Sequence, residues 1–204
     1  MGNLQLLKKR SIGFCGSRKA SERGLETAED CSAQAAESDV VVVSGNAAGV
    51  DLHAHLEALK NGGETILVLP EGINSFSIRK PFRDYWDWSR VLVVSQFEPD
   101  VPWRSYNAMA RNKIILGLSC AMIVIEAGDR GGTLDAGKST LEANTPLFVA
   151  RYSNAGEQAR GNEILIGMGG VPLNRLKSTN RANMDKVWAA FTDPNCARVQ
   201  PKLI

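Results

Sequence analysis

Short runs of apolar, mostly β-branched residues recur along the chain and alternate with longer segments of mixed polarity. Each apolar run is nearly continuous, which is typical of strands buried on both faces of a parallel sheet. The runs predict strands at residues 10–15, 40–45, 64–70, 90–97, 121–127 and 145–151. Segments with helical spacing lie between them, at 21–38, 50–62, 79–87, 104–119 and 133–144. The composition then indicates loops and turns over 152–180 and a last helix over 180–191.

This alternation predicts the fold class: α/β, with a Rossmann-like, doubly wound, mainly parallel sheet and helices on both faces. The chain has 204 residues, of which 44% are hydrophobic, and this is enough for one sizeable core. We therefore expect a Rossmann-like domain over residues 1–176 and a C-terminal helical tail over residues 177–204.

The net charge of +2 at pH 7 is too small to drive binding to a polyanion by itself, so an anionic ligand would need a local basic patch. The sequence has no CxxC pair, which favours reduced thiols and a cytoplasmic location for its cysteines, Cys15, Cys31, Cys120 and Cys196. It shows no signal region and no apolar run of membrane length, so we expect no membrane partner.

Glycine-rich loops follow three of the predicted strands: GFCGSRKAS, SGNAAGVD and EAGDRGGTLD. In an open parallel sheet, ligands bind where loops leave the carboxyl ends of the strands. Each of these loops leads into a helix whose first turn offers unpaired N–H groups and a positive dipole, and glycine lets a phosphate approach the backbone. Together the three loops predict an anion-binding crevice.

Two histidines, His53 and His55, lie on the helix after the second loop. Residues two apart on a helix point about 200° apart, whereas two ligands of one metal ion need a spacing of three or four. Asp51 and His55 have that spacing, and we expect a structural contact between them that stabilises the turn. The sequence therefore predicts no metal site and no cofactor.

The chain resembles the DprA/Smf family of DNA-processing proteins in a series of motifs that occur in the same order. These motifs are GSRKAS (16–21), SGNAAGVDLHAHLEAL (44–59), GGETILVLPEGI (62–73), RNKIILGLS (111–119), EAGDRGGTLDA (126–136) and GNEILIGMGGVPL (161–173). The resemblance covers roughly residues 10–172. It implies a recombination mediator that binds single-stranded DNA, functions in DNA uptake, forms a homodimer and has a RecA-type recombinase as a partner.

The resemblance also implies that the first two glycine loops and the RN segment line the DNA pocket, and the third loop completes the crevice. The candidate DNA- and phosphate-binding residues are Gly16, Ser17, Arg18, Ser21, Ser44, Gly45, Ala47, Gly49, Asp51, Arg111, Asn112, Lys113, Gly131, Gly132 and Thr133. Guanidinium and backbone N–H groups bind phosphate oxygens without reading the bases, so binding should be independent of DNA sequence.

Basic residues beyond the crevice would extend it into a track for a polymer: Arg79, Lys80, Arg83, Arg90, Arg104, Arg111 and Lys113. Nearby aromatic residues offer stacking surfaces for bases. We expect one or two of the following to serve in that way: Phe76, Phe82, Tyr85, Trp86, Trp88, Trp103 and Tyr106.

Differences from the family pattern and from a related enzyme family bear on function. We expect the family's N-terminal helical domain to be absent, and residues 174–204 are too few for its C-terminal winged helix. The turn GGTLDA resembles the LOG-type nucleotide phosphoribohydrolases, but Ala136 stands where their motif has a glutamate, and Asp135 is displaced by about 100° on a helix. We therefore expect a binding protein with no catalytic residues. The alternatives are a sensor that holds a free nucleotide and a protein related to those hydrolases.

Overall fold

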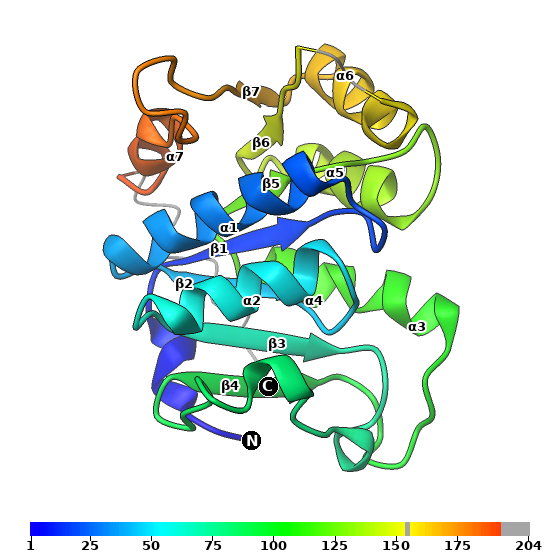
Figure 1. The fold of residues 1–204 in the computed structure, drawn as a ribbon. Coiled ribbons are helices and arrows are strands. Elements are labelled where there is room, and N and C mark those ends of the chain that lie inside the picture. The colour runs from blue at the N-terminus through cyan, green and yellow to red at the C-terminus, as the bar shows by residue number, and fades with distance from the viewer. Residues whose placement is uncertain (154–155, 193–204) are drawn as a thin grey trace.

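Seven strands form one sheet in the computed structural model, which describes residues 1–153 and 156–192 (Figure 1). The strands are β1 (Ser11–Cys15), β2 (Val41–Gly45), β3 (Thr65–Leu69), β4 (Val91–Ser95), β5 (Ala121–Val124), β6 (Leu147–Ala150) and β7 (Val171–Leu173). Their spatial order is β4-β3-β2-β1-β5-β6-β7, and neighbouring strands are parallel. The predicted fold class is confirmed.

Helices cover both faces of this sheet (Figure 1). One face packs against α1 (Glu22–Glu37), α2 (Val50–Lys60) and α7 (Asp185–Ala190). The other packs against α4 (Asn112–Gly117), α5 (Gly132–Glu142) and α6 (Arg160–Gly167), and α3 (Ser105–Ala110) precedes α4. The 3-10 turns are η1 (Leu4–Lys8), η2 (Ile73–Ser75), η3 (Lys80–Phe82) and η4 (Glu157–Ala159).

Alternate residues of the strands enter the two layers of the core. In β5, Ile123 packs on the α1 side, whereas Met122 and Val124 pack on the α5 side. A strand with apolar contacts on both faces has few polar positions along its length, which explains the nearly continuous apolar runs in the sequence.

The helix predicted over residues 79–87 does not form. Only η3 lies there, and Phe82 and Trp86 instead pack over β3 and β4. Pro81 disfavours a helical conformation in the residue before it, and the residues after it form turns from which Phe82 and Trp86 reach the sheet.

The segment 152–180, predicted as loop and turn, contains α6 and β7. The sequence did not predict α6 because its glycines are poor helix formers. Gly161 is needed for packing, since a Cβ there would lie 2.1 Å from the Gly128 carbonyl oxygen. The predicted last helix over 180–191 is shorter, since α7 begins at Asp185.

The C-terminal part of the described chain joins the same core, where α7 and the residue after it bury Val187 and Phe191. Residues 193–204 of the predicted tail lie outside the described residues.

Cys15 and Cys31 are free, buried thiols. Cys196 lies outside the described residues. Among the described helices, none is both long and apolar enough to cross a membrane.

The order of the strands creates a switch point at β1. Strands β2 to β4 extend the sheet on one side of β1, and β5 to β7 extend it on the other. The loop after β1 leads to α1 on one face, whereas the loop after β5 leads to α5 on the opposite face. Loops that diverge in this way leave a crevice at the carboxyl ends of the two strands.

Candidate functional site

A cavity of about 530 Å³ opens at this switch point, between the loop after β1 and the loop after β5. Residues of α3 and the start of α4 form a further wall. Its volume lies in the range of small-ligand sites, roughly 300–1,000 Å³. Most of the predicted site residues line it: Gly16, Ser17, Arg18, Ala47, Asp51, Arg111, Asn112, Gly131, Gly132 and Thr133.

The other predicted residues do not line the cavity: Ser21, Ser44, Gly45, Gly49 and Lys113. Lys113 lines a smaller neighbouring cavity between α4 and α5, together with Asp135. Each of the remaining four contacts, or makes room for, a residue that does line the cavity.

Asp51 is a buried carboxylate in the first turn of α2 that organises the second glycine loop. Its Oδ1 lies 2.9 Å from the hydroxyl oxygen of Ser44. Its Oδ2 accepts hydrogen bonds from the Ala47 N–H at 3.2 Å and from Arg111 Nη2 at 3.1 Å. A buried charge needs such partners, because its transfer from water is otherwise costly.

Arg111 is the buried partner of Asp51, with an exposed fraction of 6%. Its guanidinium lies against Gly45, where a Cβ would be 1.7 Å from Nη1. Gly45 is therefore needed to make room for this ion pair. Arg111 therefore lines the cavity as a mostly buried group whose charge is paired with Asp51, and its contact with DNA stays a prediction.

Arg18 stands free at the cavity. It is exposed, makes no ion pair within the described part of the chain, and its guanidinium carbon lies 5.6 Å from the centre of the Trp103 ring. Trp103 itself is 51% exposed. A cation beside an exposed indole offers a phosphate contact and a stacking surface next to each other.

Glu126 lines the cavity and was missed as a site residue, although it begins the third glycine motif. It is 3% exposed and accepts hydrogen bonds from the Ser21 N–H, at 2.8 Å, and from the Ser21 hydroxyl. Ser21 is the N-cap of α1 and also accepts from the Gly24 N–H at 3.1 Å. A carboxylate at a helix N-terminus is favoured by the helix dipole. The protein's own carboxylate therefore occupies the α1 N-terminus, which we expected to be open to phosphate.

Two glycines with positive φ begin the other helices at the site. Gly49, at φ +73°, precedes α2, and a Cβ there would lie 2.4 Å from the Ser17 carbonyl oxygen, so this glycine lets the first two loops touch. Gly131, at φ +102°, precedes α5 and has open space around it. Because Gly132 and Thr133 line the cavity, the α5 N-terminus is the one that faces it with room for an anion.

His55 makes no hydrogen bond with Asp51, so the predicted pairing of these two side chains does not form. Its Nε2 lies 2.8 Å from the Gly45 carbonyl oxygen, and its Nδ1 lies 2.5 Å from Thr65 Oγ1. The ring is 1% exposed, and burial lowers its pKa to about 4. His53 instead faces Glu29, with 2.7 Å between Nδ1 and Oε1. Within residues 1–153 and 156–192 no cluster of side chains could hold a metal ion.

Two arginines of the predicted basic track have other roles. Arg79 donates hydrogen bonds to the carbonyl oxygens of Asn46 and Ala47 and so holds the second glycine loop. Arg90 donates to the Leu59 carbonyl at 3.1 Å. It precedes β4, at the edge of the sheet opposite to the cavity, so it is not part of a track.

Some of the aromatic residues predicted to stack on bases are part of the core, and others are exposed. Phe76, Phe82 and Trp86 pack in the apolar cluster over β3 and β4. Trp103 and Tyr106 are exposed near α3 and the cavity. Tyr85 and Trp88 are also exposed, but they lie in the turns that precede β4, away from the cavity. Trp103 and Tyr106 are therefore the predicted aromatic residues that are placed to stack on a ligand there.

Asn162 is a buried residue on α6 that the sequence reading did not single out within its motif. Its Nδ2 donates to the carbonyl oxygens of Ile125 and Ala150, both at 2.7 Å, and its Oδ1 accepts from the Ala127 N–H at 2.8 Å. One side chain thus fixes the ends of β5 and β6 and the start of the loop that lines the cavity.

Comparisons with known proteins match this chain over most of its length. The family model described as DNA recombination-mediator protein A matches residues 1–181. DNA processing protein DprA from Streptococcus pneumoniae is 38% identical over 150 residues, which are 72% of this chain and 52% of that protein. The chain therefore spans about half the length of this relative.

Solved structures share the fold. The X-ray structure of DprA from S. pneumoniae has a TM-score of 0.75 at 34% identity, over 84% of this chain and 61% of that chain. A structure that describes the single-stranded DNA binding mode of DprA from Helicobacter pylori has a TM-score of 0.73 at 23% identity, over 84% and 79% of the two chains. From the family match, the chain belongs to the DNA recombination-mediator protein A family.

Proposed function

We propose that this protein binds single-stranded DNA, without preference for base sequence, in the cavity between β1 and β5. The observation that carries the proposal is the exposed pair of Arg18 and Trp103 beside the open N-terminus of α5. A guanidinium and backbone N–H groups bind phosphate oxygens, and an indole stacks on any base. The family description as recombination mediators supports a DNA ligand.

A free nucleotide is the second candidate ligand, because the cavity volume and the α5 N-terminus suit a single phosphate group equally well. Hydrolysis has less support. Ala136 is buried, and Asp135 lines the neighbouring cavity. Burial raises the pKa of the Cys15 thiol to about 12, so it stays protonated and is a poor nucleophile. We infer a binding protein rather than an enzyme.

The proposal also covers the protein partner, the oligomeric state and the location of the protein. The family description as recombination mediators supports a RecA-type recombinase as a protein partner. A homodimer, which the family resemblance implies, and a cytoplasmic location, which the cysteine pattern favours, complete the proposal.

The test is the variant Arg18→Ala. We expect it to weaken binding of a dye-labelled dT oligomer by about 1–3 kcal/mol, measured by fluorescence anisotropy, because it removes a charge-assisted phosphate contact. Its thermal unfolding transition should stay unchanged, since the side chain is exposed. Arg10→Ala is the matched control, because Arg10 is an exposed arginine at the opposite end of β1. Wild-type affinity in Arg18→Ala would remove this cavity from DNA binding.

A further inference from the structure

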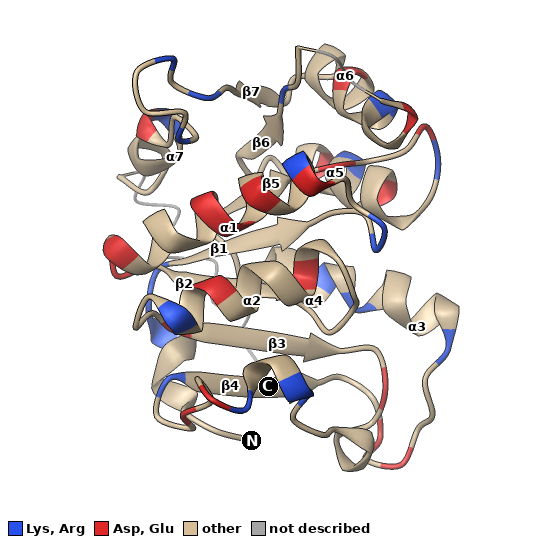
Figure 2. Cartoon of the chain, in the orientation of Figure 1, with Lys and Arg blue, Asp and Glu red and all other residues tan. Residues whose placement is uncertain are grey.

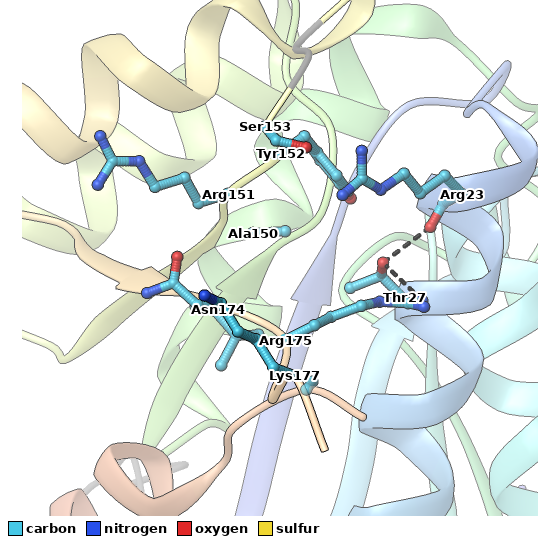
Figure 3. A pocket seen from close by; sticks show the side chains of 11 residues that line it. Arg23, Thr27, Ala150, Arg151, Tyr152, Ser153, Asn174, Arg175 and Lys177 are labelled. Carbon is cyan, nitrogen blue, oxygen red and sulfur yellow. Dashed lines mark hydrogen bonds between the residues drawn. The ribbon is translucent and has the colours of Figure 1, made fainter. Parts of the chain in front are cut away.

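A second cavity, of about 440 Å³, lies beside the ends of β6 and β7 (Figure 3). Arg23 and Thr27, in the first turns of α1, form one wall, and residues 150–153 and 173–177 form the other. The described residues that line it include none of those that line the cavity between β1 and β5. It is therefore a separate site.

The charged side chains of its lining are all basic: Arg23, Arg151, Arg175 and Lys177. Figure 2 shows basic positions both at the start of α1 and in the segment that joins β7 to α7. No aspartate or glutamate is among the described residues that line the cavity. Two of the four basic groups form ion pairs with carboxylates outside the lining, Arg151 with Glu163 at 3.6 Å and Arg175 with Glu26 at 3.7 Å. The cavity therefore holds an excess of positive charge.

Arg175 is held in place, yet one of its donors, Nε, lacks an acceptor. Its side chain is 19% exposed, and Nη2 donates to Thr27 Oγ1 at 3.2 Å. Its Nε is buried and has no hydrogen-bond partner within the described part of the chain. A buried donor without an acceptor is costly, and an anion in the cavity would supply oxygens in the fork geometry that a guanidinium prefers.

Arg23 and Lys177 make no ion pair with any described residue. The guanidinium carbon of Arg23 lies 5.2 Å from the centre of the Tyr152 ring, which orients it. In Figure 3, Arg23 and Arg175 reach the cavity from opposite walls, whereas Arg151 extends away from them. Two fixed guanidiniums that approach from two sides, with an ammonium beside them, match the oxygens of a phosphate group.

We propose that this cavity binds a phosphate ester through Arg23, Arg175 and Lys177. The ester could belong to a free nucleotide or to a DNA strand that also occupies the first cavity. Arg18 lines the first cavity and Arg23 the second, and five residues span at most about 18 Å, so one strand is able to reach both. The DNA source rests on the proposed function, whereas the phosphate site itself does not.

The test uses the double variant Arg23→Gln/Lys177→Gln, which spares the better-packed Arg175. Titration of the whole chain with inorganic phosphate, followed by two-dimensional NMR, should shift the backbone amide signals of Thr27 and Asn174. We expect phosphate to bind the double variant at least tenfold more weakly. The double variant Arg10→Gln/Lys60→Gln removes the same charge far from both cavities and should bind phosphate as the native chain does. Equal phosphate affinity in all three chains would overturn the proposal.

Two further titrations identify the source of the phosphate. If it is DNA, the Arg23→Gln/Lys177→Gln variant should bind a long dT oligomer more weakly and bind adenosine monophosphate like the native chain. If it is a free nucleotide, the reverse should hold. Arg18→Ala should weaken DNA binding and preserve the phosphate shifts at Thr27, so failure of the DNA proposal is distinguished from failure of this one.

Discussion

At Gly45, the guanidinium of Arg111 fills the space that a side chain would take. We expect Gly45→Ala to lower the free energy of unfolding by about 3–5 kcal/mol, because the displaced arginine would leave the buried Asp51 charge unpaired. Urea denaturation measures the change. Gly117→Ala is the control, since a Cβ there meets nothing within 4 Å, and its effect should stay within about 1 kcal/mol. Similar losses in the two variants would contradict this role for Gly45.

The buried ring of His55 should make stability depend on pH. Burial lowers its pKa from 6.5 to about 4, so below pH 6.5 the unfolded chain binds a proton that the folded chain excludes. The free energy of unfolding should therefore fall as pH falls from 6.5 to 4, by about 3 kcal/mol in total, and this contribution should level off below pH 4.

Urea denaturation at several pH values between 7 and 4 checks this expectation. His53→Gln should keep the pH dependence, because His53 lies on the other side of α2 against Glu29. His55→Gln should be less stable at neutral pH but lose that part of the slope. The same slope in His55→Gln and the native chain would show that another group is responsible.

At the scale of elements, Asn162 joins α6 to the ends of β5 and β6. We expect Asn162→Ala to lower the free energy of unfolding by about 3 kcal/mol, because it leaves the buried N–H of Ala127 without its acceptor and removes the hydrogen bonds to the carbonyl groups of Ile125 and Ala150. The Ala127 amide should also exchange faster with deuterium. Asn61→Ala is the control, since Asn61 is exposed and its bonds stay within one helix end. An unchanged exchange rate would argue against this anchoring role.

Strands β1 to β6 were predictable from sequence because a strand buried on both faces is mostly apolar, and the glycine loops were predictable because each follows such a strand. β7 was not, since it has only three residues and one of them is Pro172. The burial of Arg111 was not, since its partner Asp51 is 60 residues away and Gly45 makes room for it. Glu126 was missed for the same reason, as Ser21 lies 105 residues earlier. Contacts between distant segments decide which polar residues face the cavity.

At the scale of the whole molecule, the net charge of +2 means that DNA affinity has to come from local contacts. We expect affinity for dT oligomers to rise with length and to level off at a site size of ~4–16 nucleotides. Each neutralised phosphate should add about −0.7 to the slope of log affinity against log salt. Anisotropy titrations of graded oligomers at two salt concentrations measure both quantities, beside a panel of free nucleotides. Tight binding of one nucleotide with no dependence on length would favour the nucleotide sensor.

The strand order has a consequence for how the chain is made. Gly13 of β1 pairs with Val43 of β2 on one side and with Met122 of β5 on the other. One edge of β1 can therefore pair as soon as β2 is synthesised, whereas the other has to wait until β5 is synthesised. At roughly 5–20 residues per second, a ribosome needs about 5–20 s to extend the chain from β1 to β5. During that interval the nascent half-sheet β4-β3-β2-β1 exposes an apolar edge that is open to pairing with other chains. The interval between the synthesis of β1 and of β5 is therefore one in which a chaperone that covers this edge would protect the chain from aggregation.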